Sequence, residues 1–308
     1  MKIQLIIVFN HRYDANIPVL ANYYKQKFSG IKFLVPGYDG SRKDVIDVHR
    51  YVSFNFAGYF EEGYKRYRSD EADYYMFLAD DALLNPRYDE KTVSDILLEN
   101  RAKAYITDIQ PCNRKNGIGW YHAVFMNLPF VIGRENLLKF VPDYKTALKK
   151  ANDFFGSYPE SFSDEFYVDA SSREEYKKRR YKAIFDTANI NGNKIIYPLA
   201  GGWSDIVVVH KSIIHDFVRL CGIFSSMHFF CEIAIPTALM LLCERNEIIK
   251  LSDLTKNSGI SQEVLWKDDR IKLVDKYKGK LVDLIKDFSD KKLLVHPIKL
   301  SQWDVNGI

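Results

Sequence analysis

A buried strand that ends in two adjacent carboxylates constrains this chain more than any other feature. Residues Tyr74–Pro86 read YYMFLADDALLNP, an apolar run that stops at Asp80 and Asp81 and resumes briefly before an Asn-Pro turn. Burying an ionised carboxylate is costly unless a cation or strong donors meet it, so we expect both aspartates at an open strand end. A divalent cation such as Mg²⁺ or Mn²⁺ suits such a pair. A plain Asx-type turn without chemistry explains it too.

Strand-like and helical segments alternate through the first third of the chain. The predicted strands are 3–9, 31–35, 74–79 and 104–109, and the predicted helices are 17–28, 56–67 and 91–100. Such alternation predicts an α/β fold with a mostly parallel, Rossmann-like sheet flanked by helices. Ligands of these folds bind at the carboxyl ends of the strands, which is where the acidic pair lies.

The rest of the chain predicts one domain with an inserted lobe. With 308 residues and 47% hydrophobic residues, the chain can build one large core, and no repeat or low-complexity linker divides it. Residues 131–190 have a weak strand signal, and we expect a helical insertion there between 1–130 and 191–308. Its charged run Arg173–Lys182 favours a solvated helix face over a lipid or phosphate contact. Further strands are predicted at 195–199 and 206–210, and helices at 212–220 and 234–245.

Charge and cysteine usage narrow the function classes. A net charge of +4, from 44 basic and 40 acidic residues, does not favour nucleic-acid binding. The cysteines lack metal-ligand spacing and are expected to be buried free thiols in a reducing compartment. No segment has the length of a signal peptide or a membrane span. We therefore expect a cytoplasmic protein, with peripheral contact at the inner face of a membrane left open and no particular oligomeric state favoured. The four cysteines are Cys112, Cys221, Cys231 and Cys243.

Five motifs follow one another along most of the chain. They are Phe9-Asn10-His11, Ala79-Asp80-Asp81, Gly201–Asp205, Glu232 within Phe230–Thr237, and His296 within Leu294–Lys299. Their order resembles that of GT-A-fold, nucleotide-sugar-dependent glycosyltransferases of bacterial polysaccharide and glycoconjugate synthesis. The resemblance implies metal-assisted sugar transfer from a nucleotide-sugar donor to a hydroxyl of a glycan or lipid-linked acceptor. This sequence departs from the usual Asp-x-Asp pattern, because Ala82 stands where a second metal-binding aspartate is common.

The resemblance assigns the acidic pair and the late histidine to a metal and the donor diphosphate. Bound Mn²⁺ or Mg²⁺ would neutralise the charge on the departing diphosphate. Asp81 is the first ligand expected and Asp80 the second candidate. His296 is the third, since imidazole suits Mn²⁺ better than Mg²⁺. Lys299 is placed to contact the diphosphate as a point charge. Taken alone, the His-Pro sequence at 296–297 is more typical of a loop.

Two carboxyl groups are candidates for the base that takes a proton from the acceptor hydroxyl. Glu232 precedes a predicted helix with Pro236 in its first turn, and apolar neighbours are expected to raise its pKa. A carboxylate there also complements the helix dipole. Asp205 is the second candidate, as base or as acceptor ligand, although a local turn explains it too. Trp203 and Ser204, after two flexible glycines, are expected at the acceptor, with Trp203 stacking on its sugar.

The nucleotide is expected near the ends of the first two strands. By position, the resemblance assigns its contacts to Phe9, Asn10, Pro36, Tyr38 and Asp39, with Asp39 accepting from ribose or base. The sequence has no dinucleotide glycine fingerprint and no P-loop, which disfavours oxidoreductases and P-loop NTPases. Two alternatives stay open: a metal-dependent nucleotidyltransferase, and a non-catalytic nucleotide- or glycan-binding protein with a GT-A-like fold.

Overall fold

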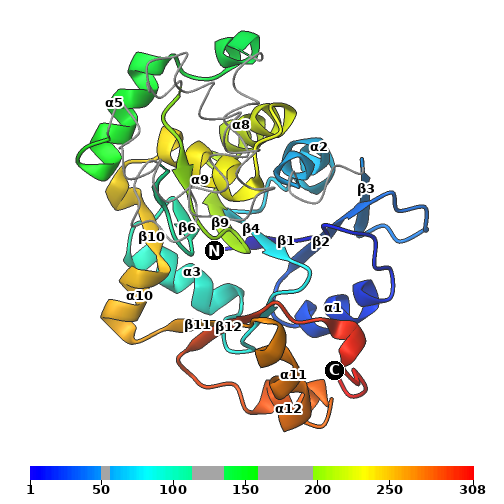
Figure 1. Ribbon diagram of the computed structural model, residues 1–308. Coiled ribbons are helices and arrows are strands. Elements are labelled where there is room, and N and C mark those ends of the chain that lie inside the picture. Colours follow the sequence, from blue (N-terminus) through cyan, green and yellow to red (C-terminus); the bar gives the residue numbers. More distant parts are fainter. Residues whose placement is uncertain (50–55, 113–134, 159–196) are drawn as a thin grey trace, which may run out of the picture.

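Seven strands form the central sheet of the molecule (Figure 1). The computed structural model describes residues 1–49, 56–112, 135–158 and 197–308. The strands are β1 (Ile3–Val8), β2 (Gly30–Pro36), β3 (Val45–Val48), β4 (Tyr74–Ala79), β6 (Ala104–Ile106), β9 (Ile206–His210) and β10 (Ile248–Lys250). Their order is β10-β6-β9-β4-β1-β2-β3, and only β9 runs antiparallel to its neighbours within this sheet. The predicted α/β class with a mostly parallel sheet is confirmed.

Alternation of side chains along the strands divides the core in two. In β1, Ile6 and Val8 belong to one hydrophobic cluster, whereas Leu5 and Ile7 belong to the other. Helices cover both faces of the sheet, which explains why the central strand β4 is apolar along its whole length. The first cluster includes residues of α2 (Ala57–Tyr67), α5 (Tyr144–Phe155), α8 (Ile214–Ser226) and α9 (Cys231–Leu242). The second includes residues of α1 (Asn16–Tyr24), α3 (Glu90–Glu99) and α10 (Leu251–Ser258).

The C-terminal segment returns to the acidic pair. A second sheet places β12 (Lys292–His296) between β11 (Ser261–Val264) and β5 (Leu83–Leu84). Because β5 begins two residues after Asp81, its antiparallel pairing with β12 brings the end of β12 back to the acidic pair. The remaining elements are β7 (Gln110–Pro111), β8 (Ala200–Gly201), α11 (Lys267–Lys276), α12 (Leu281–Lys286), η1 (Glu135–Phe140), η2 (Arg245–Glu247) and η3 (Leu300–Gln302).

Some predicted boundaries were wrong. The helix predicted at 234–245 begins at Cys231, so Pro236 lies inside α9 and not in its first turn. Phe230, at the N-cap, makes no side-chain cap, and the sequence therefore carries no start signal there. Of the strand predicted at 195–199, the described residues 197–199 are not strand, and the short β8 follows instead.

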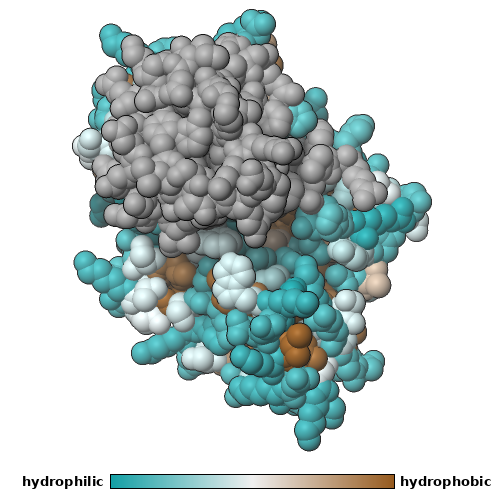
Figure 2. All heavy atoms as spheres, viewed as in Figure 1, coloured by the Kyte–Doolittle hydropathy of each residue, from teal (hydrophilic) through white to brown (hydrophobic). Residues whose placement is uncertain are grey.

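Two further predictions concern the surface and the thiols. All four cysteines are free and buried, as predicted. Within the described ranges, no helix is long and apolar enough to cross a membrane. On the face drawn in Figure 2, the described surface is mainly hydrophilic, and its hydrophobic residues form small separate patches. Within the predicted insertion 131–190 the structure describes η1 and α5, whereas Arg173–Lys182 lies outside the described residues.

Candidate active site

Three strand ends meet at one edge of the main sheet. β1 and β4 are parallel, and Val8 pairs with Ala79 at their carboxyl ends. β9 runs the other way, so its amino end lies at the same edge, where the Ala79 N–H donates to the Asp205 carbonyl over 2.8 Å. This single antiparallel strand brings Asp205 next to Asp80 and Asp81, although they are far apart in the sequence.

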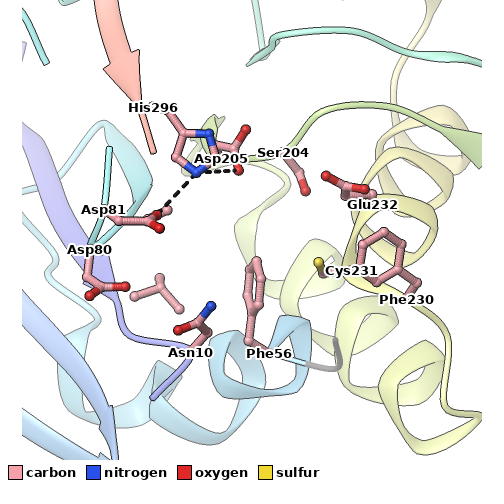
Figure 3. Close-up of a pocket in the computed structure, with 12 residues that line it drawn as sticks. Asn10, Phe56, Asp80, Asp81, Ser204, Asp205, Phe230, Cys231, Glu232 and His296 are labelled. Atoms are coloured by element: carbon pink, nitrogen blue, oxygen red, sulfur yellow. Dashed lines mark hydrogen bonds and ion pairs between the residues drawn. The ribbon is translucent and has the colours of Figure 1, made fainter. Parts of the chain in front are cut away.

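A cavity of about 220 Å³ opens at this edge (Figure 3). Its walls come from the ends of β1, β4 and β12, the segment before β9, and the first turn of α9. The cavity collects all five catalytic and metal-binding residues predicted from the sequence, together with one predicted nucleotide contact and one predicted acceptor contact. Those that line it are Asn10, Asp80, Asp81, Ser204, Asp205, Glu232 and His296.

Two basic side chains from the C-terminal segment meet Asp81. His296 Nε2 lies 3.1 Å from Asp81 Oδ1 and 3.4 Å from Asp205 Oδ1. Lys299 Nζ donates to Asp81 Oδ2 over 2.7 Å. The backbone is tied as well, because the Ile298 N–H donates to the Asp81 carbonyl over 2.6 Å. The side chains of Asp81, Asp205 and His296 are each only 16% exposed, so these charges interact with little screening by water.

The contacts determine the charge states of this cluster. Burial raises the pKa of Asp81, but the hydrogen bond from His296 and the charges of His296 and Lys299 outweigh it and lower that pKa to about 2. Burial lowers the pKa of His296, and here the carboxylates of Asp81 and Asp205 outweigh it and raise that pKa. Asp81 is therefore an anion that favours the imidazolium form of His296. The buried His296 Nδ1 has no hydrogen-bond partner among the described residues.

Asp80 differs sharply from its neighbour. Its N–H still donates to the Val8 carbonyl over 3.0 Å, so Asp80 continues the strand ladder and its side chain is only 5% exposed. Burial, with the charge of Asp81 added, raises its pKa to about 8. Both aspartates therefore follow the end of β4 and line the cavity, as predicted, but Asp80 is more deeply buried than Asp81.

Pro236 explains how Glu232 is tied to the segment before β9. Proline has no N–H, so it cannot donate to the carbonyl of Glu232 one helical turn earlier in α9. The Gly202 N–H donates to that carbonyl over 3.0 Å. A Cβ on Gly202 would lie 1.8 Å from the Asp108 carbonyl oxygen, which leaves room only for glycine. The two glycines, predicted to be flexible, are thus buried in packed backbone because α9 and Asp108 enclose Gly202.

Glu232 lies in the first turn of α9 and lines the cavity. Burial, with the charge of Asp205 added, raises its pKa to about 9, in the direction that its apolar neighbours predict. Burial also raises the pKa of Asp205, where His296 opposes the rise and Asp81 adds to it. In this conformation Glu232 therefore holds a proton at neutral pH.

The residues predicted to bind the nucleotide lie outside the cavity lining, with the exception of Asn10. Phe9 is fully buried and Pro36 is buried at the end of β2, so their side chains support the strand ends. Tyr38 and Asp39 lie in the loop after β2, where Asp39 is exposed. Their contact with a nucleotide stays a prediction.

Trp203 and Lys299, predicted to contact the acceptor and the diphosphate, do not line the cavity. Trp203 packs, half-buried, against the first hydrophobic cluster. Its stacking on a sugar stays a prediction. Lys299 is an exposed residue that reaches Asp81. This position suits the role in diphosphate binding predicted for Lys299.

Sequence reasoning missed three residues that line the cavity, and a fourth that joins two loops outside it. Phe230 and Cys231 line the cavity directly before Glu232, and that adjacency could have identified them. Phe56 lines it from the residue before α2, and no sequence signal marks it. Arg12 joins two loops, because it donates to Asp39 over 2.5 Å and to the Gly37 carbonyl over 2.9 Å. Nothing in the sequence around Arg12 predicts these contacts.

The donor atoms at Asp81 and His296 fit a small divalent cation. Within the described residues, no three His, Cys, Asp or Glu side chains form a metal site. Asp81 Oδ1 and His296 Nε2 nevertheless lie 3.1 Å apart. Adjacent ligands of an octahedral Mg²⁺ or Mn²⁺ are about 3 Å apart, and one or two protein ligands with phosphate oxygens and water complete such sites. Binding would require that His296 lose its imidazolium proton.

Comparisons with known proteins do not identify a family for this chain, so its function has to be inferred from its fold and its site. No family model matches the chain, and no curated protein matches it either. The structure defines an α/β protein with an acidic, partly apolar cavity at the carboxyl edge of a mostly parallel sheet.

Proposed function

We propose that this protein is a GT-A-like glycosyltransferase that moves a sugar from a nucleotide-sugar donor to a hydroxyl of a glycan or lipid-linked acceptor. One observation carries the proposal. Asp81, Asp205 and Glu232 converge with His296 on one cavity at the carboxyl edge of the sheet, where α/β folds bind ligands. A role in polysaccharide or glycoconjugate synthesis belongs to the same proposal.

The strand side of the cavity supplies charge for the diphosphate. Asp81 and His296 would hold Mn²⁺ or Mg²⁺, which supplies Lewis-acid stabilisation of the departing diphosphate when bound. Lys299 lies next to them and is exposed, so a phosphate oxygen can exchange with Asp81 for its ammonium group. Asp80 is a weaker ligand candidate, since it is buried and contacts neither His296 nor Lys299 among the described residues.

The helix side of the cavity supplies proton transfer. As the acceptor oxygen attacks the anomeric carbon, Glu232 takes its proton and the bond to the diphosphate breaks. With a pKa of about 9, Glu232 binds a proton strongly once it is ionised, but few molecules are ionised at neutral pH. The proposal therefore expects the rate to rise with pH toward 9. Asp205, which lies between His296 and the helix side, is the second candidate for the base.

A donor-hydrolysis assay tests the proposal. UDP-, GDP- and CMP-sugars are incubated with the protein, with Mn²⁺, with Mg²⁺ and with EDTA, and free nucleotide is measured. We expect a released nucleoside diphosphate from at least one diphosphate donor, and more of it with metal. A parallel incubation with nucleoside triphosphates and sugar 1-phosphates tests the nucleotidyltransferase alternative, which would release pyrophosphate. Binding without any turnover would identify the non-catalytic alternative. Either of these outcomes overturns the proposal.

A further inference from the structure

Trp266 is an exposed aromatic residue directly before α11. It is 70% exposed, more than any other large hydrophobic residue that the structure describes. A single exposed hydrophobic residue needs no explanation by itself. Its meaning therefore depends on where Trp266 lies.

Strand pairing places Trp266 beside the candidate active site. β11 and β12 are parallel, Val264 pairs with His296, and the Leu265 N–H donates to the His296 carbonyl over 2.8 Å. Trp266 follows with an extended backbone. Strands lie about 4.8 Å apart and rise about 3.3 Å per residue, so the Cα atoms of Trp266 and His296 are separated by roughly 8 Å. Trp266 does not line the cavity, but it lies next to the strand end that does.

The alternation of side chains gives the direction of the indole. Paired residues of neighbouring strands point to the same face of a sheet, so Val264 shares a face with His296. Leu265 points to the other face and is buried. Trp266, two residues after Val264, returns to the face of His296, whose side chain points into the cavity (Figure 3). The indole is therefore exposed on the face of the small sheet from which the cavity is reached.

Trp266 lies away from the expected position of the nucleotide. Gln262 in β11 accepts a hydrogen bond over 3.3 Å from the hydroxyl of Thr107, which directly follows β6. In the main sheet, β9 and β4 separate β6 from β1 and β2, where the nucleotide is expected. Figure 1 shows β11 and β10 on one side of the molecule and β2 and β3 on the other. A ring that extends from the cavity to Trp266 therefore belongs to the acceptor and not to the donor nucleotide.

The charges beside Trp266 favour a glycan over a membrane surface. Residues 266–270 contain two basic and two acidic side chains and carry no net charge. Attraction to anionic lipids requires an excess of basic residues, and the lysines at 276–280 lie at the other end of α11. Asp268 and Asp269, in the first turn of α11, can instead accept hydrogen bonds from sugar hydroxyls next to the indole.

We propose that Trp266 forms an outer acceptor subsite, on which one sugar ring of the acceptor stacks while the ring that carries the reacting hydroxyl lies in the cavity. The proposal rests on the proposed function, which supplies the acceptor. Because Trp266 lies beside the cavity and not in its lining, one ring cannot occupy both positions. The acceptor is therefore a glycan of at least two rings.

Fluorine NMR of the protein labelled with 5-fluorotryptophan tests the proposal. The chain has four tryptophans, and the resonance that is missing in Trp266→Phe identifies Trp266. Cellotriose, maltotriose and chitotriose are the probes, each added without donor and with EDTA. At least one trisaccharide should shift the Trp266 resonance until it saturates, and its monosaccharide should bind more weakly.

Two variants measure the contribution of the indole. Trp266→Ala should weaken binding of that trisaccharide about fivefold, the loss expected for one aromatic stacking contact, and Trp266→Phe should keep most of the affinity. Saturation-transfer NMR of the trisaccharide measures both. Ile271→Ala is the matched control, because Ile271 is an exposed apolar residue of the same helix and should leave glycan binding unchanged.

Phosphatidylcholine vesicles with phosphatidylglycerol test the membrane alternative. The proposal is overturned if no trisaccharide shifts the Trp266 resonance, or if Trp266→Ala and Ile271→Ala bind it equally well. It is also overturned if vesicles shift that resonance and both variants weaken vesicle binding alike. Donor hydrolysis without glycan binding at Trp266 would overturn this proposal alone. Glycan binding at Trp266 without donor hydrolysis would overturn the proposed function and leave a glycan-binding surface.

Discussion

The two walls of the cavity treat the same chemical group in opposite ways. On the strand wall, formed by Asp81, His296 and Lys299, the carboxyl meets two basic groups and its pKa falls to about 2. On the helix wall, formed by Phe230–Glu232, the carboxyl lies beside apolar groups and its pKa rises to about 9. One wall therefore holds a permanent anion, and the other holds a group that can exchange protons near physiological pH.

Adjacent residues show that the partner, and not the position in the chain, produces this difference. Asp80 and Asp81 follow one another at the end of β4, and both are largely buried. Only Asp81 is reached by His296 and Lys299, and the pKa of Asp80 rises to about 8. Charge binding and proton transfer can thus be separated within one small cavity.

The largest expected effect comes from removing the proton carrier on the helix wall. Glu232→Gln should lower turnover by about 10²–10⁴, the usual contribution of a positioned acid or base, while donor affinity changes little. Steady-state kinetics with the donor identified by hydrolysis measure this. The exposed Glu99→Gln on α3 is the control. If turnover survives in Glu232→Gln and is lost in Asp205→Asn, Asp205 is the base.

The next effect concerns the strand wall. Asp81→Ala should abolish Mn²⁺-dependent binding of the donor nucleotide, because it removes the first expected metal ligand, and His296→Ala should weaken that binding. Isothermal titration calorimetry with Mn²⁺ and with EDTA measures both. Affinities that stay the same in both variants, or that do not depend on EDTA, would show that His296 and Lys299 act on the diphosphate without a metal.

The pH dependence of the free energy of unfolding should distinguish the two walls, because substituting Glu232 and substituting Asp81 should change stability in opposite directions. An ordinary glutamate pKa is 4.5, and that of folded Glu232 is about 9, so between these values the unfolded chain has lost a proton that the native state keeps. Wild-type stability therefore falls as pH rises through this window, and Glu232→Gln removes the loss, gaining roughly 1–3 kcal/mol over wild type by pH 9.

For Asp81 the sign is reversed. Its folded pKa is depressed from 3.8 to about 2, so its stabilisation is present above 3.8 and lost as pH falls through 2. Asp81→Asn should therefore be less stable than wild type at pH 7, by roughly 1–3 kcal/mol. Urea unfolding of both variants at pH 5, 7 and 9, in EDTA, measures the two effects. Equal signs at pH 9 would contradict the contrast between the walls.

The sequence predicted the part of the site formed by β4 and the two aspartates after it, because this part depends on a local run of apolar residues. The apolar run 74–79 predicted β4, and the aspartates after it predicted an acidic strand end, because such runs rarely tolerate charge unless the strand stops. It did not predict that β9 would be antiparallel, and this reversal is what places Asp205 at the same edge. Strand direction depends on long-range pairing, which short apolar runs do not encode.

The positions of His296 and Glu232 depend on contacts between distant segments, such as the two-residue strand β5 pairing with β12, that the sequence does not reveal. His296 was expected near the acidic pair from the resemblance alone, while the structure brings it there through β12 and the two-residue strand β5. Pro236 was expected in the first turn of a helix, but it lies inside α9. Because proline has no N–H, the Glu232 carbonyl accepts a hydrogen bond from the Gly202 N–H instead. That consequence follows from a tertiary contact, which no local propensity predicts.

The smallest expected effect tests whether Lys299 serves the fold or the ligand. Its pair with Asp81 is partly exposed, with 44% of the Lys299 side chain accessible, and such pairs contribute less than about 1 kcal/mol to stability. Lys299→Met should therefore change the free energy of unfolding by less than that amount, yet raise the donor KM a few-fold because the diphosphate loses a cation. Lys286→Met, at an exposed position of α12, is the control and should alter neither. Urea unfolding and donor kinetics on both variants decide between the roles. A large loss of stability with an unchanged KM would make Lys299 a structural partner of Asp81, and the strand wall would then owe its diphosphate affinity to Asp81 and His296 alone.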